Sequence, residues 1–188
     1  MNAGLILLIV LIAIIGYFIA IYNGFVSLNA RIESSLSDID VLLKKRYNLI
    51  PALIETVKGY KDYESSTLQK VVEARQMGLN AKSVEDKAKA NSMLSSALKG
   101  FFALAESYPE LKANQNFLEL QKELSQIEEQ IANARRYYNA VVRDYNAKID
   151  SFPDLIIAKK FNFNKKDYFE LEEDEKSQVK QMPKVDFN

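Results

Sequence analysis

The feature that most constrains this fold is an uncharged apolar run near the start of the chain, AGLILLIVLIAIIGYFIAIY, from Ala3 to Tyr22. Twenty helical residues rise about 30 Å, which matches the hydrocarbon thickness of a bilayer. The run predicts a transmembrane helix, with Tyr17 and Tyr22 toward the end where aromatic side chains favour the membrane interface. The remainder of the chain must then act while tethered to a membrane.

A cleaved signal peptide and a buried core helix are the two alternatives to an anchor. A signal peptide has a basic segment before a shorter apolar core and ends at a small-x-small site. Here no Lys or Arg precedes the run, which ends in Ile21-Tyr22-Asn23, so we favour an uncleaved anchor. The nearest flanking basic residue is Arg31, which leans toward a cytoplasmic C-terminal part but leaves the side of the membrane undecided.

Composition removes most of the side chains used in catalysis. The 188 residues contain no histidine and no cysteine, so the commonest general base, the commonest metal ligand and the thiolate nucleophile are missing. None of the six glycines belongs to a phosphate-binding loop motif. Lys plus Arg balance Asp plus Glu at 25 each, which gives no charge signal for nucleic acid. We therefore expect no enzyme activity, no metal, no cofactor and no nucleic-acid partner.

Beyond the anchor, apolar residues recur every three or four positions, which is typical of amphipathic helices. The first helix is expected over residues 25–58. Arg46 interrupts its apolar stripe, and Pro51 removes a backbone hydrogen bond and should bend it. Three further helices are expected, over residues 63–77, 83–107 and 114–149.

Capping residues support two of these boundaries. Ser83 followed by Asp86 resembles a capping box at the start of the third helix, and Asn114 is placed to cap the fourth. Tyr108 and Pro109 suit a rigid connection between the two helices, because proline fixes its own φ.

The fourth helix keeps its apolar spacing for about four heptads, which is also compatible with a coiled coil. A bundle is favoured, because the other amphipathic helices need a covering surface. The predicted fold is all-α: a transmembrane helix and then an up-and-down four-helix bundle with long helices.

The expected domains are an anchor over residues 1–24, a bundle over 25–170 and an acidic, disordered tail over 171–188. Before this tail, the aromatic residues Phe161, Phe163, Tyr168 and Phe169 predict that the segment after residue 150 folds back on the bundle.

Several stretches together resemble the LemA family of bacterial membrane-anchored helical proteins. They are KRYNLIPAL at 45–53, VKGY at 57–60, ESYPELKAN at 106–114, ARR at 134–136, YN at 138–139 and 145–146, FP at 152–153 and YF at 168–169. The resemblance covers residues 5–170 and departs mildly at Asn48, where aspartate is common in the family. It implies an anchor followed by a helical bundle in the bacterial cell (inner) membrane, single-pass, without a catalytic motif.

Polar residues of these motifs form the candidate site. They are Arg46, Tyr47, Pro51, Glu64, Arg75, Glu106, Tyr108, Pro109, Asn114, Arg135, Tyr138, Asn139, Tyr145 and Asn146. Glu64, Glu106 and Glu128 are candidate partners for the arginines. Polar residues between helices often set helix register, and this is the favoured interpretation. The alternative is a site for an anion or a lipid headgroup.

The favoured function is a non-enzymatic scaffold or adaptor at the bacterial membrane. Its expected partners are the bilayer, through residues 3–22, and an unknown membrane or membrane-proximal protein. The alternative is a membrane-organising or membrane-shaping protein that self-assembles on the bilayer. Gly16, Ala20 and Gly24 lie four residues apart, which favours close helix approach and makes a homo-oligomer a further expected partner.

Overall fold

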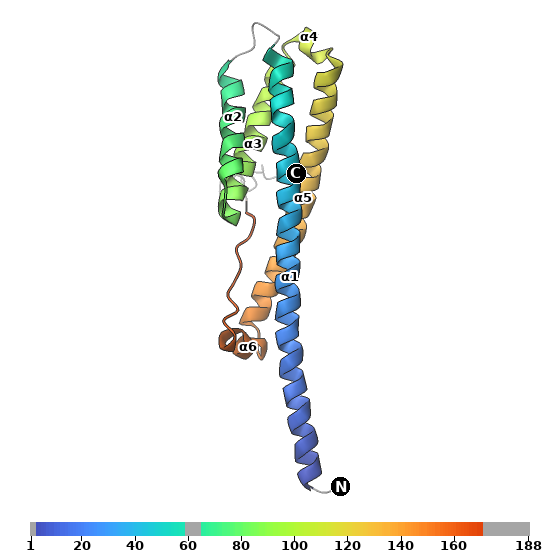
Figure 1. The fold of residues 1–188 in the computed structure, drawn as a ribbon, viewed down its shortest axis with the longest axis vertical. Helices are drawn as coiled ribbons and strands as arrows, with labels where there is room; N and C mark the ends of the chain where they lie inside the picture. The colour runs from blue at the N-terminus through green and yellow to red at the C-terminus, as the bar shows by residue number, and fades with distance from the viewer. Residues whose placement is uncertain (1–2, 59–64, 171–188) are drawn as a thin grey trace, which may run out of the picture. The chain divides into compact units, whose positions relative to one another are not determined.

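The computed structural model describes residues 3–58 and 65–170, and all the regular structure in these ranges is helical. The helices are α1 (Ala3–Lys58), α2 (Ser65–Asn80), α3 (Val84–Ala105), α4 (Pro109–Lys112), α5 (Gln115–Asp150) and α6 (Asp154–Lys160) (Figure 1). The predicted all-α class is confirmed. The predicted tail over 171–188 lies outside the described residues.

One boundary differs from the prediction. The expected helix over residues 25–58 has no start of its own, because α1 runs without interruption from Ala3 to Lys58. No proline lies between the apolar run and the amphipathic stripe, and a single glycine at position 24 does not stop a helix. The helix also continues through Pro51, as predicted. The short helix α6 was not predicted.

The chain divides into two compact units. The first, called here the anchor unit, contains the chain up to Ser37 together with Arg136–Tyr168. The second, the bundle unit, contains Asp38–Arg135 and the segment that begins at Phe169.

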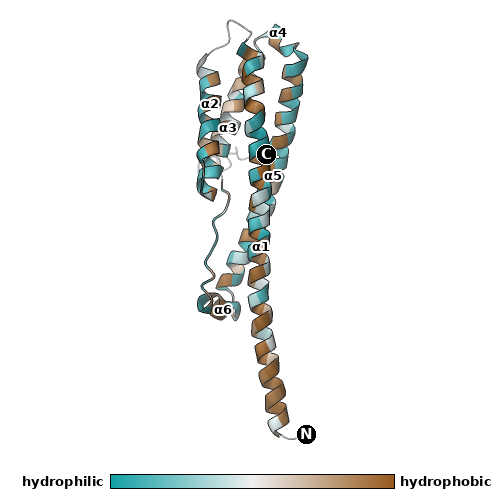
Figure 2. Cartoon of the chain, in the orientation of Figure 1, coloured by the Kyte–Doolittle hydropathy of each residue, from teal (hydrophilic) through white to brown (hydrophobic). Residues whose placement is uncertain are grey.

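In the anchor unit, the first part of α1 is long and apolar enough to cross a membrane, and almost none of it is buried by other described residues. Figure 2 shows it hydrophobic along its length, and Leu7 and Ile12 are 70% and 61% exposed. Burial begins at Ile21, which is only 6% exposed. Contacts with the rest of the unit therefore start where the predicted membrane span ends.

The end of α5 packs antiparallel to α1 in the same unit. The rings of Phe25 and Tyr145 meet edge to face with centres 5.9 Å apart. Gly24 is already covered by the Lys148 side chain, whereas Gly16 has open space around it. The aromatic residues after α6 also return to α1, since Phe163 stacks on Phe25 with centres 4.9 Å apart. The predicted folding back of this segment is confirmed.

The bundle unit contains the second part of α1, α2, α3 and the first part of α5, with α4 between α3 and α5. Helices α2 and α3 lie side by side (Figure 1). The unit's core is apolar and includes Ile39, Ile50, Leu53, Val71, Leu94, Phe101, Leu111, Phe117 and Ile131.

Both predicted caps are present in the bundle unit. Ser83 and Asp86 form a capping box at the start of α3. The side-chain oxygen of Asn114 accepts a hydrogen bond of 3.1 Å from the backbone N–H of Phe117 at the start of α5. Pro109 occupies the first turn of α4, where its missing N–H costs nothing.

Candidate functional site

Arg46 of α1 lies in the core of the bundle unit, with no exposed side-chain surface. Its Nη2 donates hydrogen bonds to the side-chain and backbone oxygens of Asn91, at 2.8 and 3.3 Å. Its Nη1 donates to the Ser95 hydroxyl at 3.1 Å and to the Glu128 carboxylate. A buried guanidinium requires a charged partner and several acceptors, and three residues from α3 and α5 supply them.

Glu128 connects this buried charge to the protein surface. One carboxylate oxygen accepts from Arg46, and the other accepts a 2.7 Å hydrogen bond from the Ser95 hydroxyl. The Glu128 side chain is nevertheless 42% exposed, because its outer face borders a groove. The cluster of Arg46, Asn91, Ser95 and Glu128 therefore fixes one wall of this groove.

The groove runs between α3 and α5 and has a volume of about 360 Å³. Its lining residues are Ser95, Leu98, Lys99, Phe102, Leu124, Ser125, Glu128, Glu129 and Ala132. Leu98, Phe102 and Leu124 provide apolar surface, while two carboxylates and one ammonium stand beside it. An apolar groove with charged borders is chemically suited to the side chains of an amphipathic helix.

Tyr47 joins α1 to α2 in the bundle unit. The Arg75 Nε donates a 2.8 Å hydrogen bond to the Tyr47 backbone carbonyl. The Tyr47 ring lies directly against Gly78, so that a Cβ at position 78 would overlap it. Burial raises the pKa of the Tyr47 hydroxyl; Arg46 acts in the opposite direction and Asp40 adds to the increase.

Motif residues of α5 hold the segment that follows α6. In the anchor unit, the Tyr138 hydroxyl donates to the backbone carbonyl of Asp167 at 2.9 Å. Asn146 exchanges two hydrogen bonds of 2.9 Å with the backbone of Lys166. Burial raises the pKa of Tyr138, and the Asp167 charge adds to the increase. These side chains serve as a clamp on an extended segment.

In the bundle unit, the Arg135 guanidinium carbon lies 5.3 Å from the centre of the buried Phe169 ring. This is a cation–π geometry, and it adds electrostatic attraction to the burial of the ring. Arg46, Arg75 and Arg135 thus have different partners within the same unit.

Comparison with known proteins decides the family. The LemA family model matches residues 35–187, which is most of the chain. The chain belongs to the LemA family. The resemblance predicted from the sequence motifs is confirmed.

Curated relatives agree with this assignment. Protein LemA of Metamycoplasma hominis is 29% identical over 174 residues, covering 88% of this chain and 78% of the relative. Magnetosome protein MamQ 2 of Paramagnetospirillum magneticum and MamQ of Magnetospirillum gryphiswaldense are each 23% identical, covering 85% of this chain and 68% of the relative. With its long apolar helix, this LemA-family chain is a membrane-associated helical protein of bacterial type.

Two of the remaining predicted residues of this LemA-family chain stand at helix ends, and the other described ones lie inside helices. Glu106 is exposed at the C-cap of α3, and Tyr108 is the N-cap of α4. Pro51 is exposed within α1, and Asn139 is half-buried on α5. Tyr145 packs against Phe25, as described above. Glu64 lies outside the described residues.

Two members of the Arg46 cluster were not predicted. Asn91 and Ser95 are separated by one helical turn on α3, and both contact the guanidinium. The spacing of Asn91 from Ala88, Leu94 and Leu98 places it on the core face of α3, and an amide there needs a polar partner. That signal marked a buried polar contact, but it could not show which residue of another helix would meet it.

Proposed function

We propose that this chain is a non-enzymatic scaffold or adaptor, anchored once in the bacterial cell membrane, which binds other proteins through the groove between α3 and α5. The observation that supports the proposal is the apolar floor of the groove, formed by the half-buried Phe102 and the buried Leu98 and Leu124 and bordered by charges. The first part of α1 would restrict this groove to partners at or near the membrane.

The Arg46 cluster supports such a role, because it holds three helices rigidly together. It fixes α3 and α5 to α1 through hydrogen bonds to a buried charge, so the groove walls are held before a partner arrives. A preformed site loses less conformational freedom on binding and so binds more tightly.

The test is crosslinking in cells followed by mass spectrometry, on the full chain with Ser125 replaced by Trp. Ser125 is an exposed groove residue, so a large side chain there should fill the groove without disturbing the core. We expect Ser125→Trp to remove most crosslinks between the bundle unit and partner proteins.

Gln126→Trp is the matched control, because Gln126 is the next residue of α5, is exposed and does not line the groove. It should keep the crosslinks of the unaltered chain. If Ser125→Trp and Gln126→Trp retain the same partners, the groove is not the binding surface.

Self-assembly on the bilayer is the second candidate function. It is supported by the open space around Gly16 and the exposed apolar side chains on every turn of the first part of α1. Gly24 is covered within the chain, which leaves Gly16 and Ala20 for close helix contact. Reconstitution of the purified chain into liposomes tests it: ordered oligomers or changed vesicle shape, without any partner, would favour self-assembly over an adaptor role.

A further inference from the structure

The segment after α5 exposes large apolar side chains in the anchor unit. Phe152 is 81% exposed, Phe161 52% and Ile156 50%. On α6 itself, Ile157 and Ala158 are buried against the unit, so the helix is already packed on one side. The exposed residues therefore form an outward-facing apolar surface that the described chain leaves uncovered. Residues 151–161 are called the α6 segment below.

The packing of α5 on α1 sets the height of this segment along the anchor. Tyr145 contacts Phe25, and Lys148 covers Gly24, so α5 runs antiparallel to α1, toward its N-terminus. Continuing this antiparallel register, the end of α5 at Asp150 lies opposite about residues 20–22 of α1. That is the last turn of the predicted membrane span.

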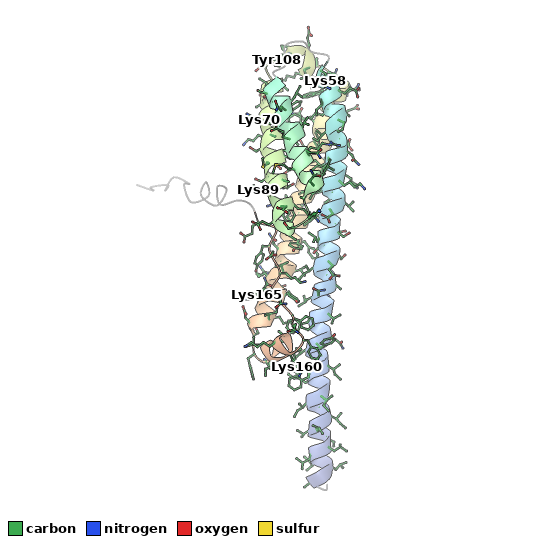
Figure 3. The ribbon with its side chains drawn as sticks, turned by 60° about the vertical axis from the view of Figure 1, so that its left-hand side comes forward. Lys58, Lys70, Lys89, Tyr108, Lys160 and Lys165 are labelled. Carbon is green, nitrogen blue, oxygen red and sulfur yellow. The ribbon has the colours of Figure 1, made fainter. Side chains whose placement is uncertain are left out.

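Two ring contacts independently support this position of the segment along α1. The Tyr22 ring lies 4.8 Å from the Phe161 ring and 5.7 Å from the Phe163 ring, centre to centre. Figure 3 shows Lys160 beside α1, next to the stretch of α1 whose side chains extend without neighbours. The α6 segment is therefore held where α1 leaves the predicted span, at the depth of lipid headgroups.

The charge of the region complements an anionic surface. Between Lys148 and Lys166 the sequence has five lysines and two aspartates, a net charge of +3. Both aspartates are paired with lysines, Asp154 with Lys148 at 2.5 Å and Asp150 with Lys165 at 2.7 Å.

Lys159 and Lys160 are exposed at the end of α6, and within residues 3–58 and 65–170 neither forms an ion pair. Two adjacent cations beside exposed aromatic residues are suited to phosphate groups above an apolar layer.

We propose that the α6 segment is a second membrane contact, which inserts Phe152, Ile156 and Phe161 into the headgroup region of a bilayer while Lys159 and Lys160 bind anionic phospholipids. Aromatic side chains favour this depth, and lysines near it are attracted to acidic headgroups. The contact would fix the tilt and rotation of the anchor unit at the bilayer, which a lone helix leaves open. The proposal does not depend on the groove between α3 and α5.

Tryptophan fluorescence tests the depth, because the natural chain has no tryptophan. The full chain with Phe152→Trp is reconstituted into vesicles of phosphatidylcholine and phosphatidylglycerol that contain lipids brominated near the headgroup end of the acyl chain. We expect several-fold stronger quenching than for Tyr137→Trp. Tyr137 is 56% exposed on α5 in the same unit, but its position is about 20 Å before Asp150 along the helix.

The charge contribution is tested in the Phe152→Trp chain with Lys159→Glu and Lys160→Glu. This pair should lower the quenching toward the Tyr137→Trp level in vesicles with phosphatidylglycerol, and change it little in phosphatidylcholine alone. Lys44→Glu with Lys45→Glu is the control, since these lysines are also adjacent and exposed on a helix, and it should have no effect.

Equal quenching of Phe152→Trp and Tyr137→Trp would overturn the membrane contact. Protection of Phe152→Trp from an aqueous quencher, without quenching by brominated lipid, would overturn it as well and would indicate that a second copy of the chain covers the surface. An unchanged signal after the Lys159→Glu and Lys160→Glu pair would overturn the role of anionic lipid.

Discussion

The Arg75 Nε donates a hydrogen bond of 2.8 Å to the backbone carbonyl of Tyr47. In an uninterrupted helix this carbonyl would accept from the backbone N–H of residue 51, but Pro51 has none. A side chain of α2 therefore replaces the hydrogen bond that proline removes from α1. The exchange explains how α1 continues through Pro51, and it ties α2 to α1 at the same point.

Arg75→Met should destabilise the bundle unit by about 1–3 kcal/mol, because it leaves the Tyr47 carbonyl without its donor while keeping most of the aliphatic volume. Urea unfolding of the full chain in detergent measures the free energy. In a Pro51→Ala background, residue 51 regains its N–H and the carbonyl no longer needs Arg75. The cost of Arg75→Met should then shrink, and an identical cost in both backgrounds would refute the exchange.

Glu128→Gln should destabilise the bundle unit by about 1.5–3 kcal/mol, because Arg46 stays buried and loses its charged acceptor. Glu129→Gln is the control: Glu129 is exposed and also borders the groove, so its change should stay within about 0.5 kcal/mol. The same unfolding measurement applies. Adding Arg46→Met to Glu128→Gln should cost less than the sum of the single changes, since the unpaired charge is removed. Simple additivity would show that the two side chains are not coupled.

The capping box of α3 makes a pH prediction. Hydrogen bonds from Ser83 hold the pKa of the Asp86 carboxyl below its ordinary value. A carboxylate whose pKa is lowered by folding stabilises the folded state above its ordinary pKa, and this contribution is lost as the pH falls through the folded value. NMR titration should show a low Asp86 pKa that returns toward the ordinary value in Ser83→Ala. Ser96→Ala, at an exposed position of the same helix, should leave it unchanged.

The periodicity of apolar residues was enough to predict the helices of the bundle, because one face of each must be buried. The contacts of Arg46 needed the three-dimensional arrangement, since Asn91 and Glu128 are 45 and 82 residues away in the sequence. A single sequence predicts that a buried arginine has partners, but many carboxylates fit equally well. The position of the α6 segment also required the structure. Its lysines are distant from the anchor in sequence, and only the antiparallel packing of α5 on α1 brings them near it.

Gly78 and Gly100 provide the sharpest comparison of packing with helix propensity. Both are inside helices, where replacement of glycine by alanine ordinarily stabilises by about 0.5–1 kcal/mol. Nothing lies within 4 Å of a Cβ at position 100, so Gly100→Ala should give this gain. At position 78 the new Cβ meets the Tyr47 ring, which is buried and has little room to move, so Gly78→Ala should instead cost about 1–3 kcal/mol. Urea unfolding of both variants in the same detergent measures the signs. Tyr47→Leu should reduce the cost of Gly78→Ala, because it removes the ring that the Cβ meets, and a stabilising Gly78→Ala would show that α2 does not pack this closely on α1.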